Sequence, residues 1–506
     1  MACRLNIGIV RAAQERDGGK LKTLAGPAEL SDDAKVSGIT LISLIIIGIV
    51  LIVSMVTDHF IMGVLLLAVP GIMFLLAGSP VRVLMVTFAV QIILTLTELS
   101  TAGIGIGILS LRADDLLSIW LVWLWILALP DRSMRGISIG LQGVFIILFL
   151  LAFGFSAYRG FTAGHDPIAL SMQLKTYGAY FLYFPLLWVL SDENAGERIW
   201  KVLLSSAVIA GFIYMIKGYT GAGDDVFVRE MTGVRVVTRQ PNAIGAILMM
   251  FIGRLWKNWS ERPALTIIIP AILLMGTGVV LSQTRGIWGG IVLALAAAWI
   301  LNLFRKKDNI HLGRKLIASL TVIAVFIILV VFAISAMGIL SASNVAQRTE
   351  NETGSYLTDT SVLSRLIAWS TILNDLSGSK MITGKGLGAI YTCFRPDIGA
   401  VVTVWYVDGS LFQIALNMGI TGVIAFLGIF IFTLIKAAGL FIRTDSRRRA
   451  GIALGIFCAV IMLLFASGFA SVLTNYRFTI LWVFLPALLQ TEIARERKES
   501  IPLPAA

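Results

Sequence analysis

The chain has 506 residues, of which 57% are hydrophobic and only 14% are charged, and its mean hydropathy is +0.88. This composition excludes an ordinary soluble domain and predicts a polytopic membrane protein. Because the alternation typical of a membrane β-barrel is absent, the apolar runs should form helices that satisfy their own backbone hydrogen bonds. The fold class that we expect is therefore an all-α membrane protein.

The formal net charge of +12 would favour a nucleic-acid partner if the basic residues formed one patch, but they sort by membrane side instead. The three cysteines (Cys3, Cys393 and Cys458) and the three histidines (His59, His165 and His311) are scattered along the chain. They offer no disulfide framework and no ligand cluster for a metal. We expect neither nucleic acid nor a metal or other cofactor.

Apolar runs of spanning length predict about 14 transmembrane helices. The first is expected to be an uncleaved anchor, because the polar leader lacks a small-residue cleavage site. The glycine-rich segment "STAGIGIGILSLRADD" is too short to span and is expected to be re-entrant or on the surface. The runs fall at roughly 39–57, 59–78, 81–99, 114–130, 136–157, 173–190, 199–216, 242–256, 264–283, 286–304, 315–338, 420–441, 450–470 and 474–491.

The positive-inside rule predicts that both termini are cytoplasmic, since roughly 27 of the 41 basic residues then lie inside. A large extracytoplasmic helical loop separates spans 11 and 12. The predicted organisation is a cytoplasmic segment (1–37), spans 1–11 (38–338), the extracytoplasmic loop (339–408), spans 12–14 (409–492) and a cytoplasmic tail (493–506).

The large loop carries the first candidate residues. "DTSVLSRLIAWSTILNDL" has the spacing of an amphipathic helix, on which Arg365 is either solvated or bound to an anion. The glycines of "TGKGLGAIY" would allow backbone amides to approach a phosphate, although the context of a nucleotide-binding loop is missing. Asp408 precedes an apolar run, where it is either a helix N-cap or a general base whose pKa is raised by burial or by a like charge.

Arginines at other predicted outer junctions form a second group. Arg285 in "LSQTRGIWGG" either snorkels to lipid head groups or binds pyrophosphate through bidentate hydrogen bonds. Gly286, Gly289 and Gly290 beside it would let helices or a lipid chain pack closely.

The outside loop before "QPNAIG" carries Arg235 and Arg239, next to Pro241 and Asn242 at the expected start of a helix. A basic cluster there favours an anion, but an ordinary charged loop would look the same. Arg112 precedes Asp114 and Asp115, and this acidic pair should face a cavity or the membrane interface because lipid exposure is costly.

These motifs together resemble the O-antigen ligase and polymerase superfamily. The matching pieces are "LRADDLL", "PNAIGA", "SQTRGIWGG", "SRLIAWSTIL" leading to "GKGLG", and "DGSLFQIALNMGITG", in the order of the family from Arg112 to Gly422. The resemblance implies a metal-independent membrane glycosyltransferase that uses an undecaprenyl-pyrophosphate-linked glycan donor at the outer face of the bacterial inner membrane. A glycan acceptor and the lipid bilayer are the other implied partners, with a chain-length regulator as an optional one.

The resemblance implies catalytic roles for Asp408 and Arg285 and substrate binding by the other candidates. Asp408 followed by Gly409 stands where ligases commonly carry a histidine before a Leu-rich helix. This departure favours a polymerase of oligosaccharide repeat units for O-antigen or exopolysaccharide. The proposed substrate-binding residues are Arg239, Arg235, Arg365, Arg112 and Asn242.

Several alternatives stay open. An O-antigen ligase or a protein O-oligosaccharyltransferase would use the same donor, and a shape-type peptidoglycan glycosyltransferase also has a large outer loop with an aspartate but normally fewer spans. A lipid-linked-oligosaccharide flippase is the rival of another class. Flippases usually show internal symmetry and midplane charges, and neither is visible in the sequence.

Overall fold

The computed structural model describes residues 79–94, 104–106, 109–111, 113–129, 138–220, 226–229, 233–236, 241–257, 265–282, 284–305, 360–396, 399–474 and 478–500. These residues all lie in the compact unit Leu76–Ala506. The predicted spans at 39–57, 59–78 and 315–338, the predicted segment 1–37, and residues 501–506 of the predicted tail 493–506 fall outside the described residues.

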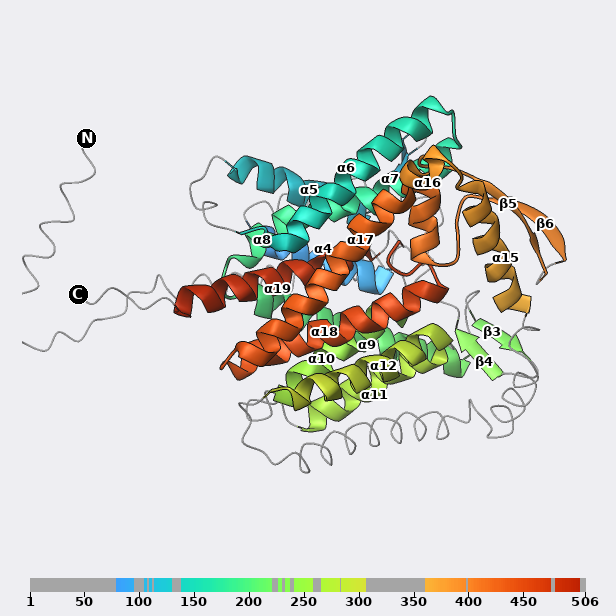
Figure 1. The fold of residues 1–506 in the computed structure, drawn as a ribbon. Helices are drawn as coiled ribbons and strands as arrows, with labels where there is room; N and C mark the ends of the chain where they lie inside the picture. Colours follow the sequence, from blue (N-terminus) through green and yellow to red (C-terminus); the bar gives the residue numbers. More distant parts are fainter. Residues whose placement is uncertain are drawn as a thin grey trace, which may run out of the picture. The chain divides into compact units, whose positions relative to one another are not determined.

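The described part of the chain is mostly helical, with three short hairpins (Figure 1). The helices are α4 (Pro80–Leu94), α5 (Ala113–Ala128), α6 (Gly140–Thr162), α7 (Pro167–Gly178), the 3-10 turn η3 (Ala179–Leu182), α8 (Tyr183–Leu190), α9 (Ala195–Thr220), α10 (Pro241–Lys257), α11 (Leu265–Leu281), α12 (Arg285–Leu303), α15 (Thr360–Asp375), α16 (Ser379–Thr383), α17 (Ser410–Arg443), α18 (Arg447–Phe469) and α19 (Thr479–Ser500). The antiparallel hairpins are β1 (Ile104–Ile106) with β2 (Leu109–Leu111), β3 (Val226–Arg229) with β4 (Gly233–Val236), and β5 (Tyr391–Arg395) with β6 (Ala400–Val404).

The apolar helices confirm a multi-pass membrane protein. Among the described residues, five helices are long and apolar enough to cross a bilayer: Gly140–Thr162, Ala195–Ile216, Gly286–Leu303, Ser410–Arg443 and Arg447–Phe469. Shorter apolar helices cover Pro80–Ile92, Asp115–Ala128, Pro241–Trp256 and Ile268–Val280. The total of about 14 spans stays a prediction.

Two predicted spans differ from the structure. The run 173–190 is not one helix, because α7 gives way to η3 before α8. Pro185 explains the change: a proline ring clashes with the carbonyl four residues earlier in an α-helix, so the chain tightens just before it. The run expected at 420–441 begins earlier, at Ser410, and contains a break at Gly419 (φ 67°, ψ −163°).

The hairpins add local structure that the all-α prediction lacks. The described part of "STAGIGIGILSLRADD" forms β1, β2 and the start of α5, and β3 and β4 lie in the arginine-containing loop before α10. The β5–β6 hairpin packs on a hydrophobic cluster that includes Ile372 of α15 and Leu376, which follows that helix. This third hairpin shapes the candidate site.

Helix α18 packs against α10, α12 and α17, and α17 packs against α6. Glycines allow the closest of these contacts, as predicted for the "RGIWGG" segment. A Cβ at Gly290 would lie 2.8 Å from the carbonyl oxygen of Met462, and a Cβ at Gly289 would lie 2.7 Å from the Phe465 ring. The predicted close helix packing is thus confirmed between α12 and α18.

The two ends of this bundle differ in character. At one end, where α17 ends and α18 begins, the Arg305 guanidinium donates to the carbonyls of Phe441 and Thr444. The buried Glu492 carboxylate lies between Arg449 and Arg495. Basic side chains concentrate here: Arg254, Arg305, Arg443, Arg447, Arg448, Arg449, Arg495, Arg497 and Lys498. The other end carries α15, α16 and the β5–β6 hairpin (Figure 1).

Replacing Arg495 with Met is expected to lower the free energy of unfolding by about 3 kcal/mol, because Glu492, which is 1% exposed, loses a partner. The change also removes hydrogen bonds to the carbonyls of Leu190 and Asp192. The thermal unfolding midpoint of the purified protein measures the effect. The control is Arg497→Met, since Arg497 is exposed on the same helix. Equal midpoints for both variants would contradict the stabilising role of Arg495.

Candidate functional site

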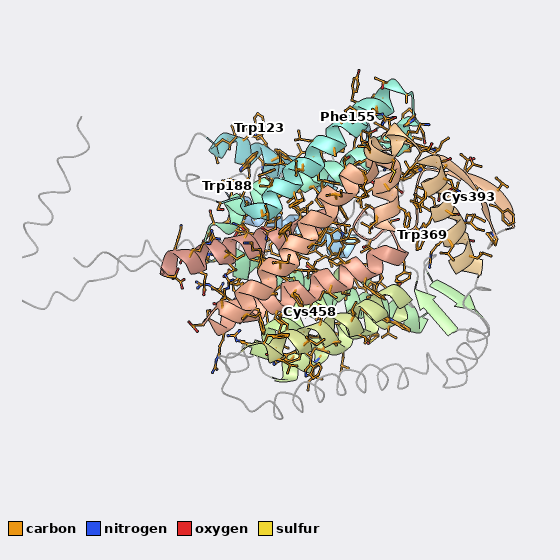
Figure 2. The ribbon with its side chains drawn as sticks, in the orientation of Figure 1. Trp123, Phe155, Trp188, Trp369, Cys393 and Cys458 are labelled. Carbon is orange, nitrogen blue, oxygen red and sulfur yellow. The ribbon has the colours of Figure 1, made fainter. Side chains whose placement is uncertain are left out.

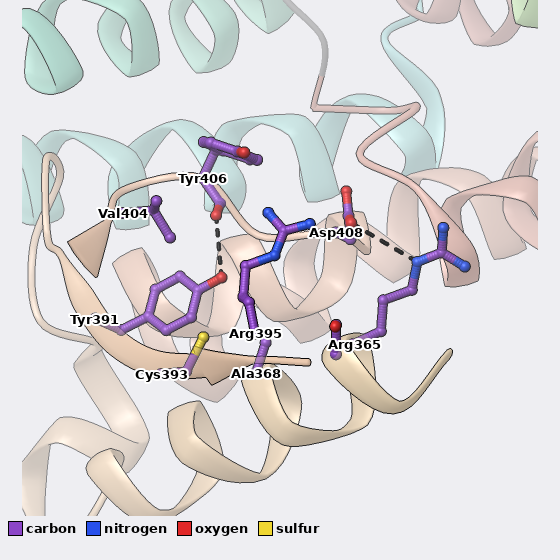
Figure 3. A pocket seen from close by; sticks show the side chains of 9 residues that line it. Arg365, Ala368, Tyr391, Cys393, Arg395, Val404, Tyr406 and Asp408 are labelled. Atoms are coloured by element: carbon purple, nitrogen blue, oxygen red, sulfur yellow. Dashed lines mark hydrogen bonds and ion pairs between the residues drawn. The ribbon is translucent and has the colours of Figure 1, made fainter. Parts of the chain in front are cut away.

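A small pocket of about 30 Å³ lies between α15, the β5–β6 hairpin and the start of α17 (Figure 3). Asp408 and Arg365 face each other there, with Arg365 Nε 3.7 Å from Asp408 Oδ2. The Arg395 guanidinium points into the same space (Figure 3). The pocket is lined by Ser364, Arg365, Ala368, Tyr391, Cys393, Arg395, Val404, Tyr406 and Asp408. Two guanidinium groups and one carboxylate thus converge on a single concave surface.

The backbone around Asp408 is held by side chains from two helices and from the segment after α18. Trp369 of α15 donates its indole N–H to the Asp408 carbonyl at 2.6 Å, and its ring stacks on Phe412 with centroids 4.6 Å apart. The Val407 N–H donates to Gln413 Oε1 at 2.6 Å, and Ser471 after α18 donates to the Val407 carbonyl. Groups fixed in this way are preorganised for binding or catalysis.

The geometry around Asp408 bears on both roles that were predicted for it, the helix N-cap and the general base. The N-cap of α17 is Gly409 (φ 105°), and no side-chain hydrogen bond caps this helix. The N-cap interpretation of Asp408 is therefore wrong. The burial that we expected of a general base is also missing, because the Asp408 side chain is 45% exposed. Its carboxylate lies beside a guanidinium at the surface of the pocket.

Tyr391 forms the buried wall of the pocket. Burial is the main cause that raises the pKa of its phenol well above the ordinary value, with smaller contributions from nearby groups including Cys393 and Asp408. The phenol therefore stays protonated at neutral pH and donates a hydrogen bond of 3.2 Å to the Tyr406 carbonyl. This bond joins the hairpin to the connection that carries Asp408.

The sequence suggested that the "GKGLG" loop after α16 brings its backbone amides close to a phosphate. Instead these amides bind acceptors on neighbouring helices, and we call this loop the clasp. The break at Gly419 frees carbonyls of α17, and loop amides bind two of them. Gly384, Gly386 and Gly388 all have positive φ, which glycine adopts without steric cost. The amide hydrogen bonds are Lys385 N to Leu416 O, Gly386 N to Asn417 O, Leu387 N to Ser156 O, and Gly388 N to Gln173 Oε1.

The structure describes the remaining predicted residues only in part. Arg285 begins α12, whose next residue Gly286 lies beside Ala466 near the end of α18. Asn242 lies in the first turn of α10, and its side-chain oxygen is buried without a hydrogen-bond partner. The side chains of Arg285 and Arg235, and the whole of Arg112 and Arg239, lie outside the described residues. Among the predicted residues whose side chains are described, Arg365 and Asp408 are in contact.

Within the described ranges, no group of three or more His, Cys, Asp or Glu side chains is placed to hold a metal ion. Among the described residues, Cys393 and Cys458 are buried thiols that form no disulfide. They lie in different parts of the molecule, since Cys393 is on the hairpin and Cys458 is on α18 (Figure 2).

Sequence reasoning missed the residues that position the pocket, namely Trp369, Gln413, Tyr391 and Arg395. Trp369 and Gln413 act on backbone groups, and such contacts leave no motif in a sequence. An available signal was the pair of strands around "FRPDIGA", whose turn residues indicate a hairpin. That hairpin would have placed Tyr391, Cys393 and Arg395 near the loop helix.

Replacing Trp369 with Phe should keep the stack on Phe412 and remove the hydrogen bond to Asp408. About 1 kcal/mol of local stability is then lost, so reaction of the buried Cys393 thiol with a maleimide should become about fivefold faster. Mass spectrometry of the labelled peptide measures this rate. Trp188→Phe, far from the pocket on α8 (Figure 2), serves as the control. An unchanged rate in Trp369→Phe would show that this bond does not hold α15 in place.

The fold and the pocket define a membrane-embedded protein with a charged pocket at one end of its helices. A comparison with protein families matches residues 270–427 to the family described as O-antigen ligase. This match confirms the resemblance to the O-antigen ligase and polymerase superfamily over residues 270–427. The matched residues include Arg285, Arg365 and Asp408, whereas Arg112, Arg235, Arg239 and Asn242 precede them. A comparison with curated proteins gives no match.

Proposed function

We propose that the protein is a glycosyltransferase that polymerises undecaprenyl-pyrophosphate-linked oligosaccharide repeat units at the outer face of the bacterial inner membrane. The family points to a membrane glycosyltransferase that acts on lipid-linked glycans. The products would be O-antigen or exopolysaccharide chains. The basic end of the bundle is then cytoplasmic, and the end with the pocket is extracytoplasmic.

The observation that carries this proposal is the position of the Asp408 pocket relative to the end of helix α18. The Leu473 N–H donates to Ser410 Oγ at 3.1 Å, and Ser471 donates to the Val407 carbonyl, so the pocket lies beside the end of α18. With 23 residues, α18 extends about 34 Å, close to the thickness of the hydrocarbon core. The carboxylate and the two guanidinium groups therefore lie near the membrane surface, where the pyrophosphate of a lipid-linked glycan would also lie.

In the proposed reaction, an acceptor hydroxyl oxygen attacks the anomeric carbon of the donor sugar. The new glycosidic C–O bond forms while the bond from the anomeric carbon to the phosphate oxygen breaks, and the electron pair leaves with the lipid diphosphate. The Asp408 carboxylate takes the hydroxyl proton, and Arg365 lies close enough to orient it. Because a diphosphate is a good leaving group, positioning and charge neutralisation supply most of the rate enhancement.

The pyrophosphate is proposed to bind Arg285 and the Arg235 and Arg239 loop, with Arg112 and Asn242 as further substrate contacts. Two features support this placement. Gly245 near the start of α10 and Gly286 near the start of α12 both contact the C-terminal half of α18. The starts of these helices therefore lie at the end that carries the pocket, where their dipoles favour an anion.

Two activities of the family remain to be separated. The match to the O-antigen ligase family favours a ligase as the second candidate. The pair Asp408 and Gly409 stands where ligases commonly carry a histidine, and this difference favours a polymerase. A protein O-oligosaccharyltransferase would share the donor and differ in the acceptor.

Deleting the gene and profiling the lipid-linked glycans distinguishes these activities. A polymerase mutant accumulates single repeat units on the lipid, which is the result that we expect. A ligase mutant instead accumulates long lipid-linked chains, and this result would reject the polymerase assignment. Loss of glycan from protein, with normal lipid-linked chains, would identify the protein-directed enzyme.

A further inference from the structure

A second cavity lies among the apolar helices, and it shares no lining residue with the Asp408 pocket. Its volume is about 270 Å³, nearly twice the ~150 Å³ that holds a benzene-sized ligand in a protein core. Its walls are mostly apolar. The lining residues are Gln91, Asp115, Ser118, Ile119, Val122, Leu174, Lys175, Gly178, Ala179, Phe181, Leu182 and Ile480.

An ion pair forms the polar part of this cavity. Lys175 Nζ lies 2.7 Å from Asp115 Oδ2, and both side chains are mostly buried, at 16% and 17% exposed. Gln91 adds a third polar side chain to the wall and is 4% exposed. Asp115 thus faces a cavity, as its position in "LRADD" led us to expect.

The ion pair lies below the extracytoplasmic end of the bundle. Pro167 begins α7 close to the clasp, since the neighbouring Asp166 approaches Gly388. Eight residues of helix separate Pro167 from Lys175, which places Lys175 about 12 Å further along the α7 axis. Ionisable groups at such depth are costly and mark functional sites more often than structural ones.

The cavity also reaches the flank of the bundle. Ile119 lines it and is 55% exposed, and Trp123, one turn further along α5, is 51% exposed. Figure 2 shows Trp123 on the outside of the bundle. In a membrane this flank contacts lipid, so a hydrocarbon chain has direct access to the apolar part of the cavity.

We propose that this cavity binds an amphiphilic lipid, with its hydrocarbon chain along the apolar wall and a head-group oxygen hydrogen-bonded to Lys175. The ammonium group donates up to three hydrogen bonds, so it serves both Asp115 and a ligand oxygen. A hydroxyl and a phosphate share this acceptor chemistry. The site is separate from the proposed glycan-joining pocket and does not depend on that activity.

Photolabelling of the purified full-length protein in lipid nanodiscs tests this proposal. Two probes are used, a long-chain alcohol with a diazirine on its chain and the phosphate monoester of that alcohol. The labelled peptides are mapped by mass spectrometry, with and without an excess of the same compound lacking the diazirine. We expect saturable labelling of α5 or α7, and the probe that is competed at the lower concentration identifies the head group.

Val122→Trp fills the cavity and should weaken probe binding about tenfold, which corresponds to about two buried methylene groups. Ile126→Trp is the matched control, because Ile126 is on the same helix, 44% exposed and outside the cavity lining. Labelling that is not saturable, or that is unchanged in Val122→Trp, would overturn the proposal and leave only contact with bulk lipid.

The double substitution Asp115→Leu with Lys175→Met tests the head-group contact separately. It removes both charges at similar volume, so a folded variant should lose the difference in affinity between the two probes. If each probe binds this variant as tightly as it binds the unmodified protein, the ion pair plays no part in binding and the proposed head-group contact is wrong. If the variant does not fold, Lys175→Gln provides the same comparison.

Discussion

Replacing Asp408 with Ala is expected to slow glycosidic-bond formation by about 100-fold or more, the usual contribution of a positioned general base. Asp408→Asn should lose nearly as much activity, because the amide keeps the size and a hydrogen-bonding oxygen but accepts no proton at neutral pH. The rate of polymer formation by membranes that contain equal amounts of each variant measures the effect.

Asp375→Asn is the matched control for this prediction. Asp375 is also an ion-paired carboxylate of the loop, 2.6 Å from Lys385 and 40% exposed, but it lies outside the pocket lining. This variant should keep most of its activity. Full activity in Asp408→Asn would show that the carboxylate accepts no proton, and the pocket would then act only by binding.

Replacing Gly384 with Ala should lower the free energy of unfolding by about 3 kcal/mol. Its φ of +73° strains any residue with a Cβ, and the new methyl group would also collide with the backbone of Asn417. The strain accounts for about 1 kcal/mol and the overpacking for about 1–3 kcal/mol. We expect the protein to lose its clasp between α16 and α17 and to appear as a poorly folded species in size-exclusion chromatography.

Gly378→Ala separates these two contributions. Gly378 has φ +60°, but a Cβ there has no neighbour within 4 Å, so only the strain of about 1 kcal/mol applies. The thermal midpoint of Gly384→Ala should therefore fall well below that of Gly378→Ala. Similar midpoints would mean that the contact between Gly384 and Asn417 contributes little to stability.

The sequence predicts several of the described membrane helices because the bilayer imposes one strong requirement, a long apolar run. The predicted runs 136–157 and 450–470 correspond to α6 and α18. The departures come from backbone geometry that hydropathy does not record. Pro185 interrupts the helix predicted at 173–190, and Gly419 interrupts α17 at a point where the loop after α16 supplies replacement hydrogen bonds.

The candidate site was predicted only in part. The loop motif identified Arg365 and Asp408 separately, since an arginine on an amphipathic helix and an aspartate before a helix are visible in the sequence. Their contact depends on how α15 docks on α17, which the Trp369 hydrogen bond and the stack on Phe412 determine. Contacts of this kind join residues that are distant in the chain, so no local pattern predicts them.

The "GKGLG" motif is a second case in which a local pattern does not predict contacts between distant parts of the chain. A glycine-rich loop suggests amides that are available to an anion, and the four amides from Lys385 to Gly388 are instead used within the protein. Their partners lie on α17, α6 and α7, three helices whose arrangement the sequence does not reveal. Positive φ at the three glycines explains the composition of the motif without any ligand.

The central claim, that the protein itself joins glycans, is tested most directly by reconstitution. Purified protein in lipid vesicles receives only a lipid-linked donor and a lipid-linked acceptor, and the products are separated by the number of repeat units. We predict new glycosidic bonds, longer lipid-linked chains and released lipid diphosphate, all of which depend on Asp408. Glycans that cross the vesicle membrane without any new glycosidic bond would identify a transporter and contradict the proposed function.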